Sequence, residues 1–164
     1  MNPQSNSDRG GGLAEYLYEA QGIGYDRIQN EVVTLVGLVG TTTLTNPEVY
    51  NVQDGWDFWL EGISGFFQDA FWAPQNFTRL AFNIQDGKSL GSIFGQAVNM
   101  GALAATQGAG PVLYFDRPYK KFEQNAQLTL TWSRVTSGGT FDPPDVNVGV
   151  TLHGMKVRRV RGQK

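Results

Sequence analysis

The chain of 164 residues is long enough for one domain with a sizeable core, and its net charge at pH 7 is −2. Charged residues make up only 17% of the chain, which contains 21 glycines and no cysteine. This composition excludes disulfides and thiolate metal sites and argues against a dedicated nucleic-acid binder. It is typical of turn-rich β proteins that bury surface against neighbours.

The first part of the chain, residues 1–30, is predicted to be an N-terminal arm that is partly flexible. Residues 1–12 are polar and Gly-rich, offer nothing to bury and do not resemble a secretory signal, so we expect the protein to be made in a cytoplasm. Residues 13–29 have some helix-like spacing that Gly22 and Gly24 interrupt, which leaves a short helix and an extended arm both open. No run of about 18 apolar residues predicts a membrane span.

The domain itself is expected to cover residues 31–164. Segments rich in Val, Thr, Leu and aromatic residues follow one another along it, most of them bounded by Gly, Pro, Asn or Asp, as strands are. The predicted strands are residues 31–39, 41–44, 56–63, 78–85, 112–115, 126–135 and 146–157.

Two of these segments alternate apolar and polar residues with the two-residue period of a strand. Leu128–Trp132 and Val146–Leu152 are expected to turn their apolar side chains inward on two neighbouring strands. At His153–Gly154 the apolar phase changes to Met155 and Val157, which predicts a β-bulge. Together the segments predict an all-β fold, a single jelly-roll-like antiparallel β-sandwich with an extended N-terminal arm.

Two connections are unusual in composition. Residues 65–74 hold too many aromatic residues for a solvated loop, and residues 95–110 carry no charge at all. A charge-free segment such as 95–110 either packs on its own domain or is buried against another subunit. The aromatic residues of the first segment, together with Trp56 and Trp59, predict core and subunit interface, with a sugar-binding platform as the alternative.

The C-terminal end, residues 156–164, is strongly basic. As a tail it would contact an acidic surface or nucleic acid, or simply be solvated. The candidate interface residues are therefore Phe66, Phe67, Phe71, Trp72, Met100, Leu103, Arg158, Arg159 and Arg161.

Catalytic chemistry finds little support in the sequence. His153 is the only histidine, which excludes a two-histidine metal site, and no G-x-S-x-G motif surrounds a serine. Asp54 with Asp57, and Asp142 with Asp145, are pairs of carboxylates that we interpret as turn residues. We expect no catalytic residue, no metal and no cofactor, and a protein that is not an enzyme.

Several motifs occur in an order that resembles a group of bacteriophage virion proteins with a jelly-roll-like sandwich. They are Trp56-Asp57-Phe58, the Asp86-Gly87 turn, Arg117-Pro118-Tyr119, Phe122–Asn125 and the basic exit Leu152–Arg158. The resemblance implies a cement, decoration or minor capsid subunit in the virion, assembled in the host cytoplasm. Its partners would be the major capsid protein and copies of itself. The alternatives are a carbohydrate- or receptor-binding module of a phage tail or fibre and a sandwich-fold hydrolase, which the single histidine argues against.

Overall fold

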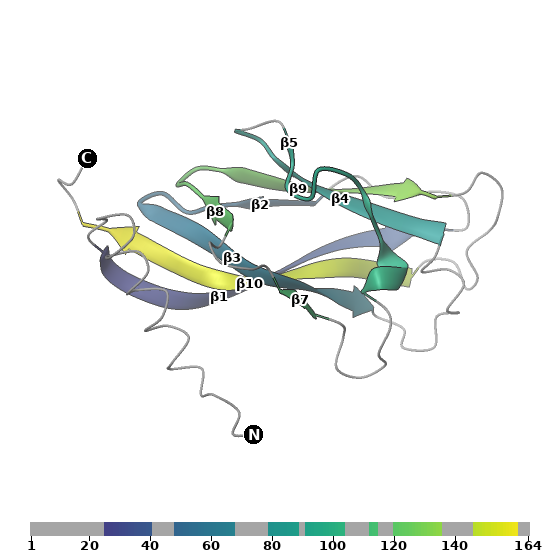
Figure 1. Ribbon diagram of the computed structural model, residues 1–164, viewed down its shortest axis with the longest axis horizontal. Helices are drawn as coiled ribbons and strands as arrows, with labels where there is room; N and C mark the ends of the chain where they lie inside the picture. Colours follow the sequence, from purple (N-terminus) through teal and green to yellow (C-terminus); the bar gives the residue numbers. More distant parts are fainter. Residues whose placement is uncertain are drawn as a thin grey trace, which may run out of the picture.

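The computed structural model describes residues 25–40, 48–67, 79–88, 91–103, 112–114, 120–135 and 146–160. These residues form two antiparallel β-sheets that are stacked face to face (Figure 1). The all-β sandwich predicted from the sequence is thereby confirmed.

The first sheet, here called sheet A, is built on three long strands. β1 and β3 lie on either side of β10, and the short strands β7 and β8 both pair with the other edge of β3. The bounds are β1 Tyr25–Val39, β3 Trp56–Phe67, β7 Val112–Tyr114, β8 Lys120–Phe122 and β10 Val146–Arg159.

The second sheet, sheet B, is built on β9, which lies between β2 and β4. The short strands β5 and β6 pair with the other edge of β4, and a single 3₁₀ turn, η1, follows β6. The bounds are β2 Glu48–Asn51, β4 Leu80–Asp86, β5 Gly91–Ser92, β6 Val98–Asn99, η1 Met100–Ala102 and β9 Gln127–Arg134.

The pairing of the strands is nested along the chain. β1 pairs with β10, β2 with β9, β3 with β7 and β8, and β4 with β5 and β6. The chain is therefore arranged as one long hairpin that has been rolled up, with strands from its two halves side by side in each sheet.

The core lies between the two sheets and is rich in aromatic rings. Phe58 of sheet A stacks on Phe122 with the ring centroids 6.3 Å apart, while Phe82 of sheet B meets Phe94 and Trp132 edge-on. Such aromatic pairs contribute about 0.5–1.5 kcal/mol each beyond the area that they bury. Tyr50 of sheet B meets the ring of Phe58 of sheet A edge-on, with the centroids 5.6 Å apart, so side chains of the two sheets meet in the core.

The two best alternating segments do face inward, but they are not neighbours. Leu128 and Leu130 of β9 and Val148–Leu152 of β10 contribute buried core residues, and Trp132 is half-buried at the edge of the core. β9 belongs to sheet B and β10 to sheet A, so the two runs meet across the core. Alternation predicts which side chains point inward and carries no information on which strands pair.

The first strand begins earlier than the sequence predicts. β1 starts at Tyr25 instead of Glu31, so residues 25–30 belong to the sandwich and not to the arm. Residues 41–44 lie outside the described part of the chain. Strands β2, β5, β6 and β8 were not predicted, because two to four residues contain too little of a pattern to recognise.

The predicted bulge lies on a different strand. β10 keeps unbroken register with β1 through His153 and Gly154, whereas against β3 His153 faces Gly62 and Gly154 faces Leu60. The extra residue is therefore Glu61 of β3. Gly154 stays in the inward phase, where an added Cβ would lie 2.2 Å from a backbone oxygen of β3, so only glycine fits there.

The apolar residues that follow Gly154 point away from the core. Met155 and Val157 form a second, smaller cluster with Trp59 and Ile28 on the other side of sheet A. The change of apolar phase in the sequence thus marks a strand that is buried on both faces over this stretch, and not a slip in its register.

Candidate functional site

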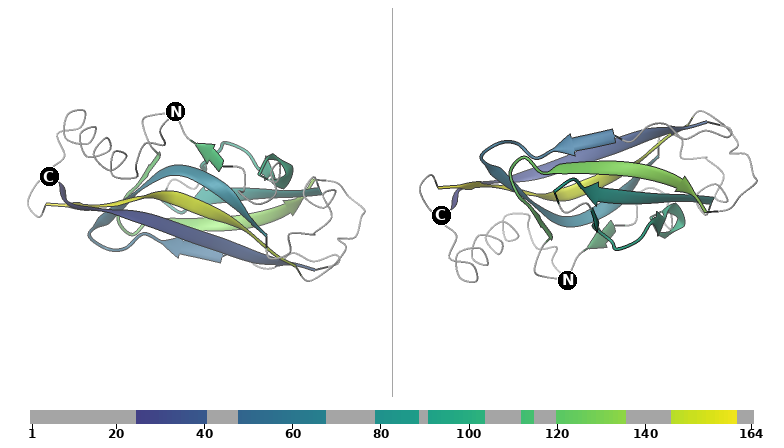
Figure 2. Two further views of the ribbon diagram at one scale, coloured as in Figure 1. Left: turned by 90° about the horizontal axis from the view of Figure 1, so that it is seen from below. Right: turned by 90° about the horizontal axis from the view of Figure 1, so that it is seen from above.

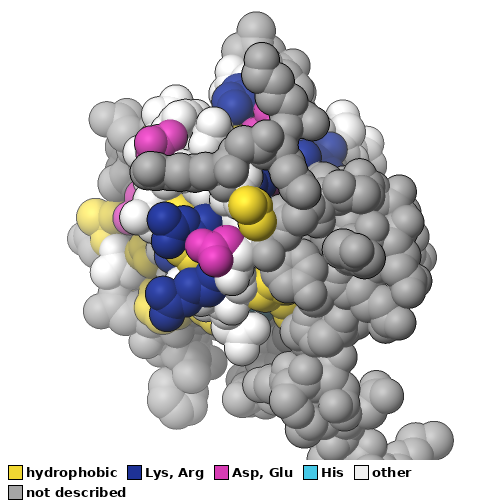
Figure 3. Space-filling model, turned by 90° about the vertical axis from the view of Figure 1, so that its left-hand side faces the viewer, with side chains coloured by type: hydrophobic (Ala, Val, Ile, Leu, Met, Phe, Trp, Pro, Cys, Tyr) yellow, Lys and Arg dark blue, Asp and Glu magenta, His cyan; other side chains and the backbone are white. Residues whose placement is uncertain are grey.

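Most of the charged residues in the described part of the chain gather at one end of the sandwich, where β1 and β3 begin and β10 ends. Every ion pair found among the described residues is located there or at the adjoining β4–β5 and β8–β9 turns. Figure 3 looks onto this surface and shows Lys and Arg side chains grouped around acidic ones. We call this region the charged end.

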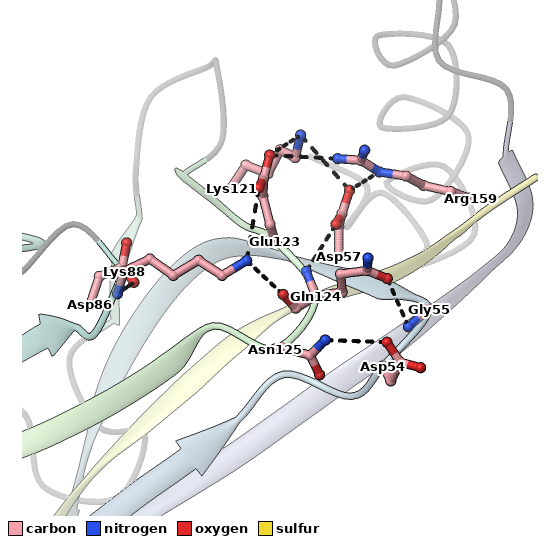
Figure 4. A network of polar contacts seen from close by, with 10 residues as sticks. All are labelled: Asp54, Gly55, Asp57, Asp86, Lys88, Lys121, Glu123, Gln124, Asn125 and Arg159. Carbon is pink, nitrogen blue, oxygen red and sulfur yellow. Dashed lines mark hydrogen bonds and ion pairs between the residues drawn. The ribbon is translucent and has the colours of Figure 1, made fainter. Parts of the chain in front are cut away.

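Asp57 is the centre of the charged end, because it is the buried carboxylate of the group, with only 3% of its surface exposed. Arg159 Nε donates a hydrogen bond to Asp57 Oδ2 at 2.6 Å, and the backbone N–H of Gln124 donates to Oδ1 at 3.2 Å (Figure 4). Lys121 Nζ lies 3.8 Å from Oδ2. A carboxylate withdrawn from water requires such partners, since leaving it unpaired would cost several kcal/mol.

Glu123 joins the cations around Asp57 into a network. Its carboxylate oxygens lie 3.6 Å from Lys121 Nζ, 3.8 Å from Arg159 Nη2 and 3.9 Å from Lys88 Nζ. Lys88 Nζ also donates a hydrogen bond to the carbonyl oxygen of Gln124 at 2.7 Å. Because the Glu123 side chain is largely exposed, these contacts contribute little each, and Asp57 is the group on which the network depends.

Two turns are clasped together beneath this network. Asn125 has a left-handed φ of 61°, which asparagine tolerates better than most residues, and its Nδ2 donates to Asp54 Oδ1 at 3.2 Å. Gln124 Oε1 accepts a hydrogen bond from Gly55 N at 3.0 Å. The β2–β3 and β8–β9 turns therefore hold each other, and Asp54 serves as a turn residue, in line with its interpretation from the sequence.

A pocket of about 170 Å³ opens at this end, lined by Asp57, Lys88, Glu123, Gln124, Asn125 and Arg159. Its lining is polar, and both of its carboxylates already face cations. The Asp57 carboxylate is engaged by Arg159 and Lys121, whereas Asp54, the other member of the pair considered in the sequence, accepts a hydrogen bond from Asn125.

A second polar group links the two sheets beside the charged end. Tyr50 of β2 donates a hydrogen bond to Glu31 Oε1 at 3.3 Å, and Lys156 Nζ lies 3.2 Å from Glu31 Oε2 and 5.4 Å from the ring centroid of Trp56. Burial, together with the negative charge of Glu31, raises the pKa of Tyr50 far above its ordinary value of 10. Tyr50 is therefore a neutral donor that ties sheet B to sheet A.

The basic end of the chain differs from the predicted tail. β10 runs to Arg159, and each basic residue in its last part has an acidic partner: Lys156 has Glu31, Arg158 has Asp26 at 3.8 Å, and Arg159 has Asp57. Arg161 lies outside the described residues. The basic residues as far as Arg159 therefore belong to a strand and not to a separate tail, and of the partners left open by the sequence they meet acids, which come from the same chain.

The outer face of sheet A, the face turned away from the core, is very different in character. Figure 2 shows this face in its left view. By the strand register, the charged residues on it are Asp57, Lys121 and Arg159 at the charged end and the bulge residue Glu61, and the remaining residues of β1, β3 and β10 on it carry no charge. They are Ile28, Asn30, Val32, Thr34, Val36 and Leu38 of β1, Trp59, Gly62, Ser64 and Phe66 of β3, and Asn147, Gly149, Thr151, His153, Met155 and Val157 of β10.

Part of this face exposes large hydrophobic side chains. Val32 is 64% exposed, and Leu38 and Phe66 are each 37% exposed. Two polar pairs lie between them: Thr34 Oγ1 and Thr151 Oγ1 are 3.1 Å apart, and Ser64 Oγ and His153 Nε2 are 2.7 Å apart. Away from the charged end, and apart from Glu61, the face is thus uncharged, partly apolar and internally hydrogen-bonded.

The Ser64–His153 pair brings together two residues that the sequence analysis considered separately. Burial lowers the pKa of His153 below its ordinary value of 6.5, so the imidazole is neutral near pH 7. Among the described residues no carboxylate is hydrogen-bonded to the ring, so the orienting acid of a catalytic triad is not found in this part of the chain. The pair is an ordinary cross-strand contact between β3 and β10.

The predicted interface residues are distributed over three kinds of position. Phe66 is exposed on the outer face of sheet A, while Met100 and Leu103 are completely buried in the core of the chain and are not on its surface. The described part of the charge-free segment therefore packs on its own domain, the first of the two alternatives. Phe67 belongs to β3, but its side chain is not among the parts that the structure describes. Phe71 and Trp72 are outside the described residues.

The aromatic residues do not form one platform among the described residues. Trp56 lies on the inner side of β3 beneath Lys156, whereas Trp59 is buried on the opposite side of the same strand. Asp57, between Trp56 and Phe58, is the residue whose role was missed. A charge inside an apolar strand pattern was the signal that a buried partner had to exist.

No family model matches the sequence, and no curated protein matches it. In the part of the chain that the structure describes, no helix is long and apolar enough to cross a membrane. The same residues contain no cluster of three or more potential metal ligands among His, Cys, Asp and Glu.

Proposed function

We propose that the protein is a non-enzymatic structural subunit of a bacteriophage particle, which binds and stabilises the capsid lattice as a cement, decoration or minor capsid protein. Its partners would be the major capsid protein and copies of itself, and its place of action the virion. The fold would be a jelly roll.

The nested strand pairing supports this proposal. Pairing of first with last, second with second-last and so on is what a rolled-up hairpin of two Greek keys requires, which is the jelly-roll arrangement. Jelly rolls occur in viral capsid proteins but also in lectins and cupins, so the strand order by itself is only an analogy of fold.

The outer face of sheet A is the observation that carries the proposal. An antiparallel sheet that faces water normally alternates apolar inner residues with polar or charged outer ones. Here β1 and β10 instead turn uncharged residues outward along most of their length, and Val32, Leu38 and Phe66 are exposed among them. Such surfaces are typical of sites that another protein covers.

The charged end fits a supporting role in this proposal. Lys156, Arg158 and Arg159 are neutralised by acids of the same chain, so they are not a free basic patch for phosphate groups. We therefore assign attachment to the outer face of sheet A. Contact of the basic end with nucleic acid stays a prediction that concerns Arg161.

The alternative function, a carbohydrate- or receptor-binding module, has less support. Sugar sites use aromatic rings that share one accessible surface, and Trp56 and Trp59 lie on opposite sides of β3. Phe66 is the described aromatic residue that is exposed on the outer face. A flat face with one exposed ring fits a protein partner better than a sugar.

The test is occupancy on purified virions, measured by mass spectrometry as the copy number relative to the major capsid protein. The change Phe66→Lys places a charge on the outer face and should sharply lower occupancy, because a buried unpaired charge is costly. Val135→Lys is the matched control: this valine is 51% exposed but lies just beyond β9 of sheet B, and occupancy should be unchanged.

Thermal unfolding of both variants shows whether the fold is retained, since exposed substitutions usually change stability by about 0.5 kcal/mol or less. Full occupancy of Phe66→Lys would refute attachment through this face. Absence of the wild-type protein from purified virions would refute the capsid role as a whole.

A further inference from the structure

The strand β1 forms one edge of sheet A, and the proposed attachment through the outer face makes no use of this edge. β1 has 15 residues and pairs with β10 on one side, while its other side forms the border of the sheet (Figures 1 and 2). Edge strands of this length are usually protected against pairing with other chains by Lys, Pro, a bulge or short length.

Two contacts show which backbone groups point away from the sheet. The N–H of Val36 donates to the carboxylate of Glu48 in β2, so it is turned away from β10, whereas the carbonyl oxygen of Leu35 lies against Gly149 of β10. Because the register is unbroken from Arg27 to Val39, the N–H and C=O groups alternate in this way along the strand.

The even-numbered residues therefore present their backbone groups at the open border. These are Ile28, Asn30, Val32 and Thr34, and no backbone partner for their outward groups is found in the described part of the chain. Farther along, Glu48 occupies the border at Val36. The open stretch is thus residues 28–34.

This stretch lacks the usual protection of an edge. It contains no Lys, Pro or bulge, and its one charged residue, Glu31, is engaged by Lys156 and Tyr50. Among the large hydrophobic residues that the structure describes, Val32 is the most exposed, at 64%. A strand with these properties is suited to β-augmentation, in which a further strand is added to a sheet edge.

We propose that β1 pairs antiparallel with β1 of a second copy of this chain, with the two-fold axis at Asn30, so that two copies of sheet A become one continuous sheet. This inference does not depend on the capsid role, because it concerns the border of sheet A and not its outer face.

The side chains select this register. With the axis at Asn30, Ile28 lies opposite Val32 of the second copy on the outer face, which covers the exposed valine. On the inner side Arg27 lies diagonal to Glu31 of the second copy, within reach of a long side chain. Each of these contacts occurs twice because the interface is two-fold symmetric.

Neighbouring registers are less favourable. An axis at Glu31 would set the two Glu31 residues opposite each other. An axis at Val32 would require the outward N–H of Val36, which already donates to Glu48. An axis at Gln29 would place Asp26 opposite Val32. Asn30 is therefore the centre that combines apolar and charge complementarity.

A single cysteine tests the register, because the chain contains none of its own. In the Asn30→Cys variant the two cysteines would lie in a hydrogen-bonded pair with Cα atoms about 5.5 Å apart, within the range of a disulfide. Mild oxidation should give a covalent dimer on a non-reducing gel. Val32→Cys is the control: its two copies would be about 14 Å apart, so no dimer should form.

A mixture of Ile28→Cys and Val32→Cys proteins should cross-link to each other, since these residues are opposite in the proposed register. Cross-linking of Val32→Cys alone as strongly as Asn30→Cys would overturn the register. Failure of Asn30→Cys to cross-link would overturn it as well.

Analytical ultracentrifugation tests the dimer itself. The wild-type protein should sediment as a dimer, and Asn30→Pro should sediment as a monomer with an unchanged β-type circular dichroism spectrum. Proline removes an N–H that points outward and therefore no hydrogen bond to β10. A wild-type monomer, or a dimer that persists in Asn30→Pro, would overturn the proposal, whereas the capsid role is decided separately by Phe66→Lys.

Discussion

The change Asp57→Asn isolates the charge at the centre of the charged end, because it keeps the shape of the side chain. The amide oxygen can still accept the hydrogen bond from Gln124 N, but the amide N–H₂ then meets Arg159 Nε, which is also a donor. Loss of a charge-assisted bond costs about 1.5–3 kcal/mol, and the loss of attraction to Lys121 adds to it. We expect a cost of about 3 kcal/mol.

This cost should be visible in thermal unfolding followed by circular dichroism. For a chain of this length 1 kcal/mol corresponds to about 2–4 °C, so the midpoint should fall by roughly 6–12 °C. Asp54→Asn is the matched control, since Asp54 is exposed and accepts one hydrogen bond from Asn125, and its midpoint should change little.

A double-mutant cycle with Arg159→Gln tests the mechanism. Arg159→Gln alone should cost less than Asp57→Asn, because Gln124 N–H and Lys121 still face the carboxylate. The double variant should cost clearly less than the sum of the two, because both changes remove the same contact. Additive effects, or an unchanged midpoint for Asp57→Asn, would refute the view that this network holds the end of the sandwich.

Two further substitutions test the packing and the pH response of sheet A. Gly154→Ala should lower the unfolding midpoint strongly, because its Cβ would lie 2.2 Å from Trp59 O and 2.8 Å from the Phe58 ring; a variant as stable as wild type would show that the bulge is misplaced. Burial lowers the pKa of His153 in the folded chain below the ordinary value of 6.5 that it has in the unfolded chain. At a pH between these two pKa values, the unfolded chain binds a proton that the folded chain does not. The free energy of unfolding, measured in urea, should therefore fall as the pH drops from about 7 through 6.5 toward the lowered pKa, and His153→Gln should reduce this fall; an identical pH dependence in both proteins would contradict the assignment.

Sequence patterns were most informative about which side chains of a strand point toward the core. The alternation in 128–132 and 146–152 predicted strands with the correct inward faces, because successive side chains of a strand point to opposite sides whatever lies beside it. The same rule could not show that these strands belong to different sheets. Pairing depends on backbone groups that every residue carries alike.

Which residues a given side chain contacts could be known only from the fold. Arg158 and Arg159 were expected in a basic tail, and Met100 and Leu103 at an interface, because composition describes a segment without its neighbours. Asp26 and Asp57 reach the two arginines only after β1, β3 and β10 have paired.

The sequence by itself therefore determined the all-β class, the approximate positions of the long strands and the inward direction of the apolar side chains in 128–132 and 146–152, since these follow from the local period of the chain. The tertiary structure alone decided the nested strand order, the place of the bulge in β3 and the ion network around Asp57. It also decided which face of sheet A is uncharged and which strand is left at its border. These features arise from contacts between residues far apart in the chain, whose closeness comes from the pairing of whole strands.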